Sequence, residues 1–306
     1  MSRYSFDIPP TASLVIASAF WGVATVISKK LLASVPPVTF LIIQLAPSVS
    51  LLWFLVLIRR AQPAERRGLL ALTLFGWLNP GLSYTLSMLG LTRTTASVAT
   101  LLWATEPALI IAMAWLLLRE PVTLRILTAT TMAACGVLLV SGLAEGGHAA
   151  GDRYGDALVL AGVFCCALYT VLSRKIVPGV DLLFTVALQQ SAGLVWVATL
   201  WLLGSRGAGT EGVLALSWSE WIGGGLSGVM YYAAAFWFYL GGLRSVPATI
   251  AGGFLNLTPI FGIATAYVFL GERLTLIQWA GAATIILSVL ALLMWSPRVE
   301  SAVAIE

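Results

Sequence analysis

The sequence predicts an all-α integral membrane protein in which ten transmembrane helices form two inverted five-helix repeats around a central cavity. Three observations lead to this fold class: the composition, the number of apolar runs, and landmarks that recur along the chain. Of the 306 residues, 59% are apolar and only 10% are charged, and the mean hydropathy is +0.94. Soluble domains carry about 25% charged residues. This chain has too few polar groups to cover the surface of a soluble fold.

Apolar runs of membrane-spanning length make up most of the chain. A helix that crosses the hydrocarbon core needs about 20 mainly apolar residues. Ten runs meet this requirement, at residues 11–31, 37–58, 67–90, 95–118, 123–143, 155–175, 180–203, 219–240, 246–270 and 274–295. A membrane barrel would instead show alternating strands of about 10 residues, which these runs lack. The loops are too short to hold a separate soluble domain.

Each run ends where charges, prolines or glycine clusters interrupt the apolar residues. The separating segments are, in order, residues 32–36, 59–66, 91–94, 119–122, 144–154, 176–179, 204–218, 241–245 and 271–273. The first run is expected to be an uncleaved span, because no soluble domain follows it.

The placement of lysine and arginine predicts the orientation. When the loops are assigned to alternate sides, eleven basic residues fall on the side of the chain termini and six on the other side. Cytoplasmic loops carry an excess of Lys and Arg. We therefore expect both termini in the cytoplasm and the chain in a bacterial inner membrane.

Landmarks of the first half recur in the second half. At an offset of 152 residues the pairs are Gly90 and Gly242, Pro107 and Pro259, Glu120 and Glu272, and Thr123 and Thr275. Gln44 and Gln189 match at an offset of 145. The chain is therefore expected to contain two repeats, residues 11–143 and 155–295. Five helices are an odd number, so the second repeat enters the membrane from the opposite side, an arrangement typical of transporters.

Short segments within the repeats carry a family resemblance. Residues 118–124 (LREPVTL), 270–276 (LGERLTL) and 20–22 (FWG) resemble conserved segments of the drug/metabolite transporter superfamily, EamA-type branch. Arg119 and Ser288 stand where that family usually has glycine. The resemblance implies ten helices, a central cavity lined by the first, third, fourth, sixth, eighth and ninth spans, and export of metabolites. Within the family, the chain is most similar to bacterial exporters of aromatic and other neutral amino acids.

Helix-breaking residues concentrate near the centres of the spans. Proline removes a backbone donor and frees a carbonyl one turn earlier. Such groups are tolerated at membrane depth only when they are buried in protein or line a wet cavity. We therefore predict helix breaks or hinges at Pro80, Pro107 and Pro259, around a central cavity.

Glu106 is the only acidic residue well inside a predicted span. A charge at that depth costs about 2.5–3.5 kcal/mol on insertion scales. One interpretation makes Glu106 the partner of a substrate ammonium group or a proton-coupling carboxyl. In the other, the carboxyl is protonated and bonded to carbonyls freed by Pro107, or to Asn79.

Aromatic and amide side chains at the same depth complete the candidate site. Trp103 precedes Glu106 by three residues, which places both on one face of a helix. Aromatic faces suit flat apolar groups and attract ammonium groups, worth about 0.5–2 kcal/mol. The predicted substrate-binding residues are Trp21, Asn79, Tyr84, Trp103, Glu106, Tyr169, Tyr231 and Asn256. The same aromatic and amide groups could instead serve helix packing and interhelical hydrogen bonds.

Other classes of function are disfavoured by the sequence. The basic residues occur singly or in pairs, unlike the clustered patch of a nucleic-acid-binding protein. His148 is the only histidine, and Cys135, Cys165 and Cys166 lie in apolar runs without zinc-ligand spacing. We expect no catalytic residues, metal, cofactor or nucleotide-binding loop, which argues against an intramembrane enzyme.

These observations favour a secondary transporter that exports small amphipathic metabolites, foremost aromatic or neutral amino acids, by alternating access. Its expected partners are the lipid bilayer and the small-molecule substrate, with protons as a candidate coupling ion. Efflux of cationic aromatic drugs is the alternative. Two observations support this alternative. Glu106 can bind a cation, and no midplane Arg or Lys is present to bind the carboxylate of an amino acid.

Overall fold

The computed structural model is all-helical in the part of the chain that it describes. That part comprises residues 8–32, 35–61, 66–94, 96–140, 152–176, 181–204, 216–270 and 275–295, and no strand occurs in it. Six helices there are long and apolar enough to cross a membrane. Shorter apolar helices span Glu106–Leu118, Leu124–Val140 and Leu276–Leu292. The predicted all-α membrane class is confirmed.

The helices of the first half follow the predicted runs closely. They are α1 (Pro10–Leu32), α2 (Pro37–Arg59), α3 (Arg66–Gly76), η1 (Trp77–Leu82), α4 (Ser83–Leu91), α5 (Ala96–Trp103), α6 (Glu106–Met113), η2 (Ala114–Leu118) and α7 (Leu124–Val140). Pro37 begins α2 because the first helical position needs no amide donor. Arg60 ends it in the left-handed conformation, with φ 49°.

The second half repeats this order of elements, with the additional short turn η6 between α13 and α14. Its elements are α8 (Arg153–Ile176), α9 (Leu182–Gly204), α11 (Trp218–Gly228), η5 (Val229–Ala234), α12 (Ala235–Leu243), α13 (Ala248–Phe254), η6 (Leu255–Leu257), α14 (Thr258–Thr265), η7 (Ala266–Leu270) and α15 (Leu276–Trp295). A capping box begins α11. The Ser217 side chain accepts from the Glu220 amide, and the Glu220 carboxylate accepts from the Ser217 amide at 2.8 Å.

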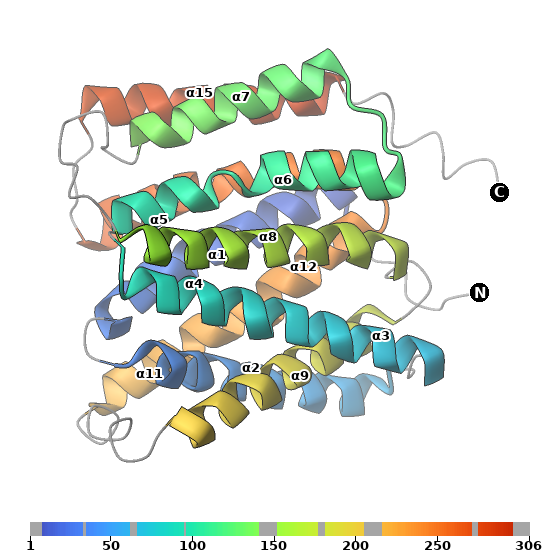
Figure 1. Cartoon of the computed structure of the whole chain (residues 1–306), viewed down its shortest axis with the longest axis vertical. Coiled ribbons are helices and arrows are strands. Elements are labelled where there is room, and N and C mark those ends of the chain that lie inside the picture. The colour runs from blue at the N-terminus through green and yellow to red at the C-terminus, as the bar shows by residue number, and fades with distance from the viewer. Residues whose placement is uncertain are drawn as a thin grey trace.

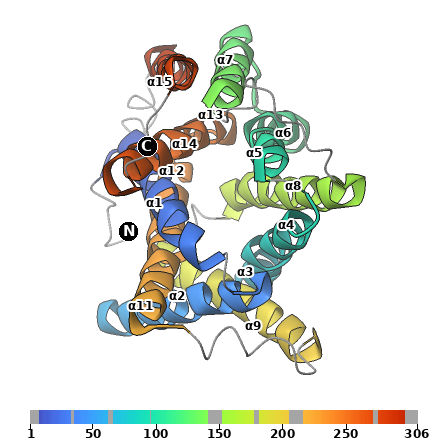
Figure 2. The same cartoon turned by 90° about the vertical axis from the view of Figure 1, so that its left-hand side faces the viewer.

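The two halves interleave instead of packing as separate bodies. Helix α1 packs against α12 and α14 of the second half, and α8 packs in the same way against α4 and α6 of the first half. Helices α2 and α9 pack on each other, as do α7 and α15. In both views α7 and α15 lie side by side at one edge of the molecule (Figure 1 and Figure 2). These main packings made by one repeat therefore have counterparts in the other.

Helix irregularities also recur at the 152-residue offset. The wide π-helical turns η1 and η5 occupy equivalent positions, and so do η2 and η7. Pro80 lies in η1, where Asn79 has the non-helical angles φ −149° and ψ 121° and the Asn79–Pro80 peptide is cis. In η5, Tyr232 stands at the position equivalent to Pro80. The helix irregularity at this position thus recurs in both repeats, as a kink at Asn79–Pro80 in η1 and as a π-helical turn without proline in η5. Such turns are frequent at functional sites.

The helices of the fourth and ninth predicted runs are interrupted at matching places. Helix α5 ends at Trp103 and α6 begins at Glu106, while η6 separates α13 from α14. Pro107 and Pro259 lie in the first turn of α6 and α14, respectively. A missing amide costs little at that position. Both prolines therefore begin a helical segment and do not disrupt the middle of one.

Glycines allow equivalent close crossings between the halves. A Cβ added to Gly76 would meet the Gln189 carbonyl, and one added to Gly228 would meet the Gln44 carbonyl, each closer than real Cβ contacts occur. Both glycines are related by the offset of 152 and both glutamines by 145. Small residues let membrane helices approach at the backbone. These two crossings hold α3 against α9 and α11 against α2.

Candidate functional site

Most of the predicted aromatic residues belong to one connected group of rings. We call this group the aromatic cluster; it comprises Trp21, Tyr84, Trp103, Tyr169, Tyr231, Tyr232, Phe236 and Tyr239. Tyr84 stacks on Trp103 with ring centroids 5.9 Å apart and meets Tyr231 at 5.6 Å. Trp21 lies 6.4 Å from Tyr231. The cluster therefore joins α1, α4 and α5 of the first half to η5 of the second half.

Helix α12 supplies rings that the sequence analysis did not single out. Phe236 lies 5.4 Å from Trp21 and 6.0 Å from Tyr169, and so links these two predicted residues. Tyr239 meets Trp21 at 5.3 Å. The signal was available as a dense run of aromatic residues between 231 and 239. Offset ring contacts of this kind are each worth about 0.5–1.5 kcal/mol beyond burial.

The aromatic cluster is packed in this conformation. Tyr169 and Tyr232 are each 1% exposed, Tyr84 is 5% exposed and Trp21 is 8% exposed. Two hollows that the structure describes lie elsewhere, beside α6, η2 and α7. The centre is a closed site in which side chains occupy the space between the two halves.

Glu106 lies next to this cluster in a small polar group at membrane depth. Its side chain is buried in the first turn of α6, against the Cys166 thiol of α8. The Asn79 side chain donates from Nδ2 to Cys166 Sγ at 3.4 Å. Cys166 therefore connects the two predicted polar residues. The sequence analysis treated this thiol as a small apolar residue and missed its position.

Trp103 and Glu106 lie on either side of a tight turn between α5 and α6, and their expected shared helical face stays a prediction. Residues 104–105 interrupt the helix, and Thr105 N donates to Leu102 O at 3.1 Å in a tight turn. Trp103 accordingly stacks on Tyr84, while Glu106 reaches Cys166.

Asn256 has a different environment from the other predicted residues. Its Nδ2 donates to the Gly253 carbonyl at 3.1 Å within the same helical stretch. The surrounding turn, η6, packs against α1, α15 and α7. The observed bond satisfies a carbonyl at the interruption between α13 and α14, which is a structural role.

Two equivalent glutamines have different hydrogen-bond partners. Gln44 Nε2 donates to Ser28 Oγ at 2.9 Å and to Ser227 Oγ at 3.0 Å. Gln189 instead accepts a bond from the Tyr169 hydroxyl at 2.9 Å, and its Nε2 has no partner among the described residues. The polar network is thus complete around Gln44 and open around Gln189, beside the aromatic cluster.

Four buried polar atoms in or around the cluster have no hydrogen-bond partner in the described part of the chain. They are the donors Trp21 Nε1 and Gln189 Nε2, the acceptor Asn79 Oδ1, and the Tyr239 hydroxyl. Buried polar groups are nearly always hydrogen-bonded, and an unmade bond costs about 1–3 kcal/mol. Unpaired donors and acceptors at the aromatic cluster can receive a polar ligand.

Glu120 holds the two halves together at one end of the bundle. Its carboxylate accepts from the Ala248 amide at 2.9 Å and from the Thr249 amide at 2.9 Å, which caps the start of α13. Glu120 of the first half therefore caps a helix of the second half. Its repeat counterpart Glu272 lies outside the described residues.

Replacing Glu120 with alanine is expected to destabilise the protein by about 1–2 kcal/mol, because two helix-start amides lose their acceptor. The midpoint of thermal unfolding in detergent should fall by about 2–4 °C for each kcal/mol. Arg125→Gln, at an exposed position on the same end of the bundle, is the control. Equal unfolding midpoints for the two variants would show that the cap contributes no stability.

Further polar contacts cross between the halves at both ends of the bundle. At the end that contains Glu120, Lys175 Nζ donates to Leu117 O at 3.3 Å. At the opposite end, Arg93 and Asp152 form an exposed ion pair at 3.6 Å, a kind worth about 0–1 kcal/mol. Arg244 lies near the end that contains Glu120. Burial lowers the pKa of its guanidinium, and the negative charge of Asp181 opposes that shift.

Comparison with known proteins identifies the family. The EamA-like transporter family matches residues 11–142 and 153–294, which is one match in each half. Two relatives from Bacillus subtilis (strain 168) bear the names uncharacterized transporter YetK and uncharacterized transporter YvbV. YetK is 25% identical over 287 residues, covering 90% of this chain and 83% of YetK. YvbV is 28% identical over 293 residues, covering 92% of each chain.

A solved structure supports the fold. A protein known by its crystal structure aligns with a TM-score of 0.80 and 17% identity, over 96% of this chain and 100% of its own. The two family matches together cover most of the chain, and the resemblance to the EamA-type branch is confirmed. The chain is a multi-pass membrane protein that belongs to the EamA-like transporter family.

Proposed function

We propose that this transporter exports small amphipathic metabolites, foremost aromatic or neutral amino acids, by alternating access across a bacterial inner membrane. The observation that carries the proposal is the position of Glu106. This buried carboxyl and the unpaired groups near it lie beside an aromatic cluster to which both repeats contribute. A substrate held there contacts both halves at once, as alternating access requires.

The polar groups suit a zwitterion. An ammonium group can bind the Glu106 carboxylate and the free acceptor Asn79 Oδ1. A carboxylate can accept bonds from the free donors Trp21 Nε1 and Gln189 Nε2. The rings of Tyr84 and Trp103 suit a flat side chain. Donors and acceptors together favour an amino acid over a ligand that has only a positive charge.

Efflux of cationic aromatic drugs is the second candidate. It is favoured by the chemistry of the cluster, in which Glu106 is the charged group and the donors are neutral. A quaternary cation needs only a carboxylate and aromatic faces. The two candidates therefore differ in whether the neutral donors are used.

The proposed topology has ten transmembrane helices in two inverted repeats, residues 11–143 and 155–295, with both termini in the cytoplasm. It is supported by the equivalent packing of α1 on α12 and of α8 on α4, and by the matching π-helical turns. Polar contacts join the two halves at both ends of the bundle. If each set of contacts breaks in turn, the central site becomes accessible from one side of the membrane at a time.

Counterflow into reconstituted vesicles tests the proposal. Vesicles loaded with unlabelled phenylalanine should take up labelled phenylalanine, and an excess of a quaternary aromatic cation should compete weakly. Trp21→Phe, which keeps a ring but removes the Nε1 donor, should weaken phenylalanine uptake and leave cation binding unchanged. Repeating the assay with and without a pH gradient tests proton coupling. If no amino acid shows counterflow and the cation is transported, the drug interpretation replaces the first one.

A further inference from the structure

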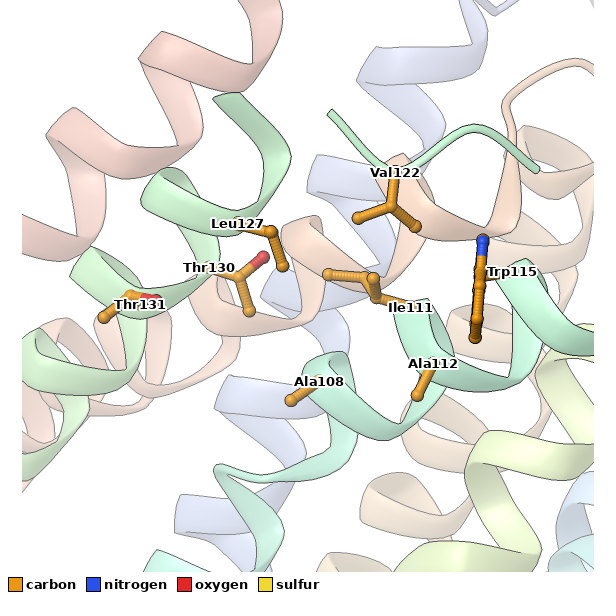
Figure 3. A pocket seen from close by; sticks show the side chains of 8 residues that line it. All are labelled: Ala108, Ile111, Ala112, Trp115, Val122, Leu127, Thr130 and Thr131. Atoms are coloured by element: carbon orange, nitrogen blue, oxygen red, sulfur yellow. The ribbon is translucent and has the colours of Figure 1, made fainter. Parts of the chain in front are cut away.

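A groove on the outer side of the bundle lies apart from the proposed substrate site. It has a volume of about 460 Å³ and runs between the outward face of α6 and the first turns of α7. Figure 3 shows Ala108, Ala112 and Trp115 along one wall and Leu127 across from them. Because α7 packs on α15, it leaves this face of α6 uncovered.

The groove wall is apolar and accessible. Trp115 is 62% exposed and Leu127 is 48% exposed. The small side chains of Ala108 and Ala112 create the depth, since a larger residue at either position would fill the space between the walls (Figure 3). The groove extends over about two turns of helix, from Ala108 to Trp115, or roughly 10 Å at 1.5 Å per residue. An acyl chain fits such a surface.

A cationic group lies at one end of the groove. Trp115 and Val122 also line a second hollow, which contains Arg119 and Glu120. The Glu120 carboxylate is engaged by the two amides at the start of α13. The exposed Arg119 side chain has no carboxylate partner among the described residues. The mouth of the groove, where η2 ends, therefore presents an exposed guanidinium beside a carboxylate that is already hydrogen-bonded.

We propose that this groove is a binding site for one anionic phospholipid, with an acyl chain along α6 and the headgroup phosphate on Arg119. The apolar wall suits an acyl chain, and Arg119 lies at the end of that wall, where the headgroup phosphate of the same lipid would be. Arginine binds phosphate through two parallel hydrogen bonds.

Lipid retention by the purified full-length protein tests the proposal. Native mass spectrometry should show one bound phosphatidylglycerol and a preference over phosphatidylcholine with the same acyl chains. Arg119→Gln should reduce the preference about fivefold, the effect of one basic residue near a membrane surface. Arg153→Gln, an exposed arginine at the opposite end of the bundle, is the matched control and should retain the preference. Inorganic phosphate alone should give no thermal stabilisation.

A second experiment fills the groove with larger side chains. Ala112→Phe and Ala108→Phe should each lose the bound lipid, whereas Ala283→Phe, at an exposed position on α15, should retain it. Both groove positions are exposed, so a folded protein is expected and size-exclusion chromatography verifies it. The proposal is overturned if Arg119→Gln behaves as Arg153→Gln does, if phosphate alone stabilises the protein, or if the filled groove retains the lipid. A dimer that the groove variants dissociate would assign the groove to a second copy and would also overturn it.

Discussion

Glu106→Gln is expected to reduce counterflow of an amino-acid substrate by about 10- to 100-fold. The substitution keeps the shape of the side chain and removes the negative charge that faces a substrate ammonium group. A hydrogen bond to a charged group contributes about 1.5–3 kcal/mol, and 1.4 kcal/mol corresponds to a factor of ten. Initial rates of counterflow at several substrate concentrations measure the loss.

Glu106→Asp is the matched variant for this experiment, because it keeps the charge and shortens the side chain. It should retain more activity than the glutamine variant. The pH profile separates the two charged roles. If the carboxyl carries a coupling proton, the pH dependence of the wild type disappears in Glu106→Gln. If Glu106→Gln transports normally across the whole pH range, neither charged role survives and Glu106 is a buried structural residue.

Gly228→Ala should destabilise the protein by about 3 kcal/mol or more. The added methyl group would lie on the backbone of Gln44, where α11 crosses α2. Overpacking of a tight interior typically costs 1–3 kcal/mol, and a helix backbone yields less readily than a side chain. Gly76→Ala should have a similar effect at the equivalent crossing with Gln189. Thermal unfolding in detergent measures both.

Gly225→Ala provides the control on the same helix. Its added methyl group would lie 3.5 Å from Pro47 Cγ, which is an ordinary contact. Glycine costs up to about 1 kcal/mol relative to alanine in a helix, so this variant should be neutral or slightly more stable. If Gly228→Ala and Gly225→Ala unfold at the same temperature, backbone contact at the crossing is not what limits the packing.

Much of the fold could be predicted because charges and prolines mark helix ends in an apolar chain. The run predicted at 37–58, for example, became α2 (Pro37–Arg59). The pairing of helices could not be predicted in this way. In a bilayer the lipid-facing and protein-facing sides of a helix are both apolar, so hydrophobic periodicity does not distinguish them. The crossings at Gly76 and Gly228 became visible only in the structure.

The sequence predicted the aromatic members of the candidate site, because their depth in the membrane alone brings them together. Trp21, Tyr84, Trp103, Tyr169 and Tyr231 lie at similar depth in different runs, and the structure places them in one group of rings. Residues whose role depends on a partner were missed. Cys166 became significant only through its contacts with Asn79 and Glu106. The tight turn at residues 104–105, between α5 and α6, was likewise not predicted, because neither residue is a proline or glycine.

The interleaving of the halves also affects assembly in the membrane during synthesis. The ribosome releases the first half before α8 and α11 have been synthesised. At that stage Gln44 can bond Ser28 but not Ser227, and Asn79 and Glu106 have no Cys166 beside them. The nascent first half therefore holds polar side chains in the bilayer without their final partners. Its assembly is completed only when the last helices arrive, so a chain truncated after residue 143 should be a target for membrane quality control.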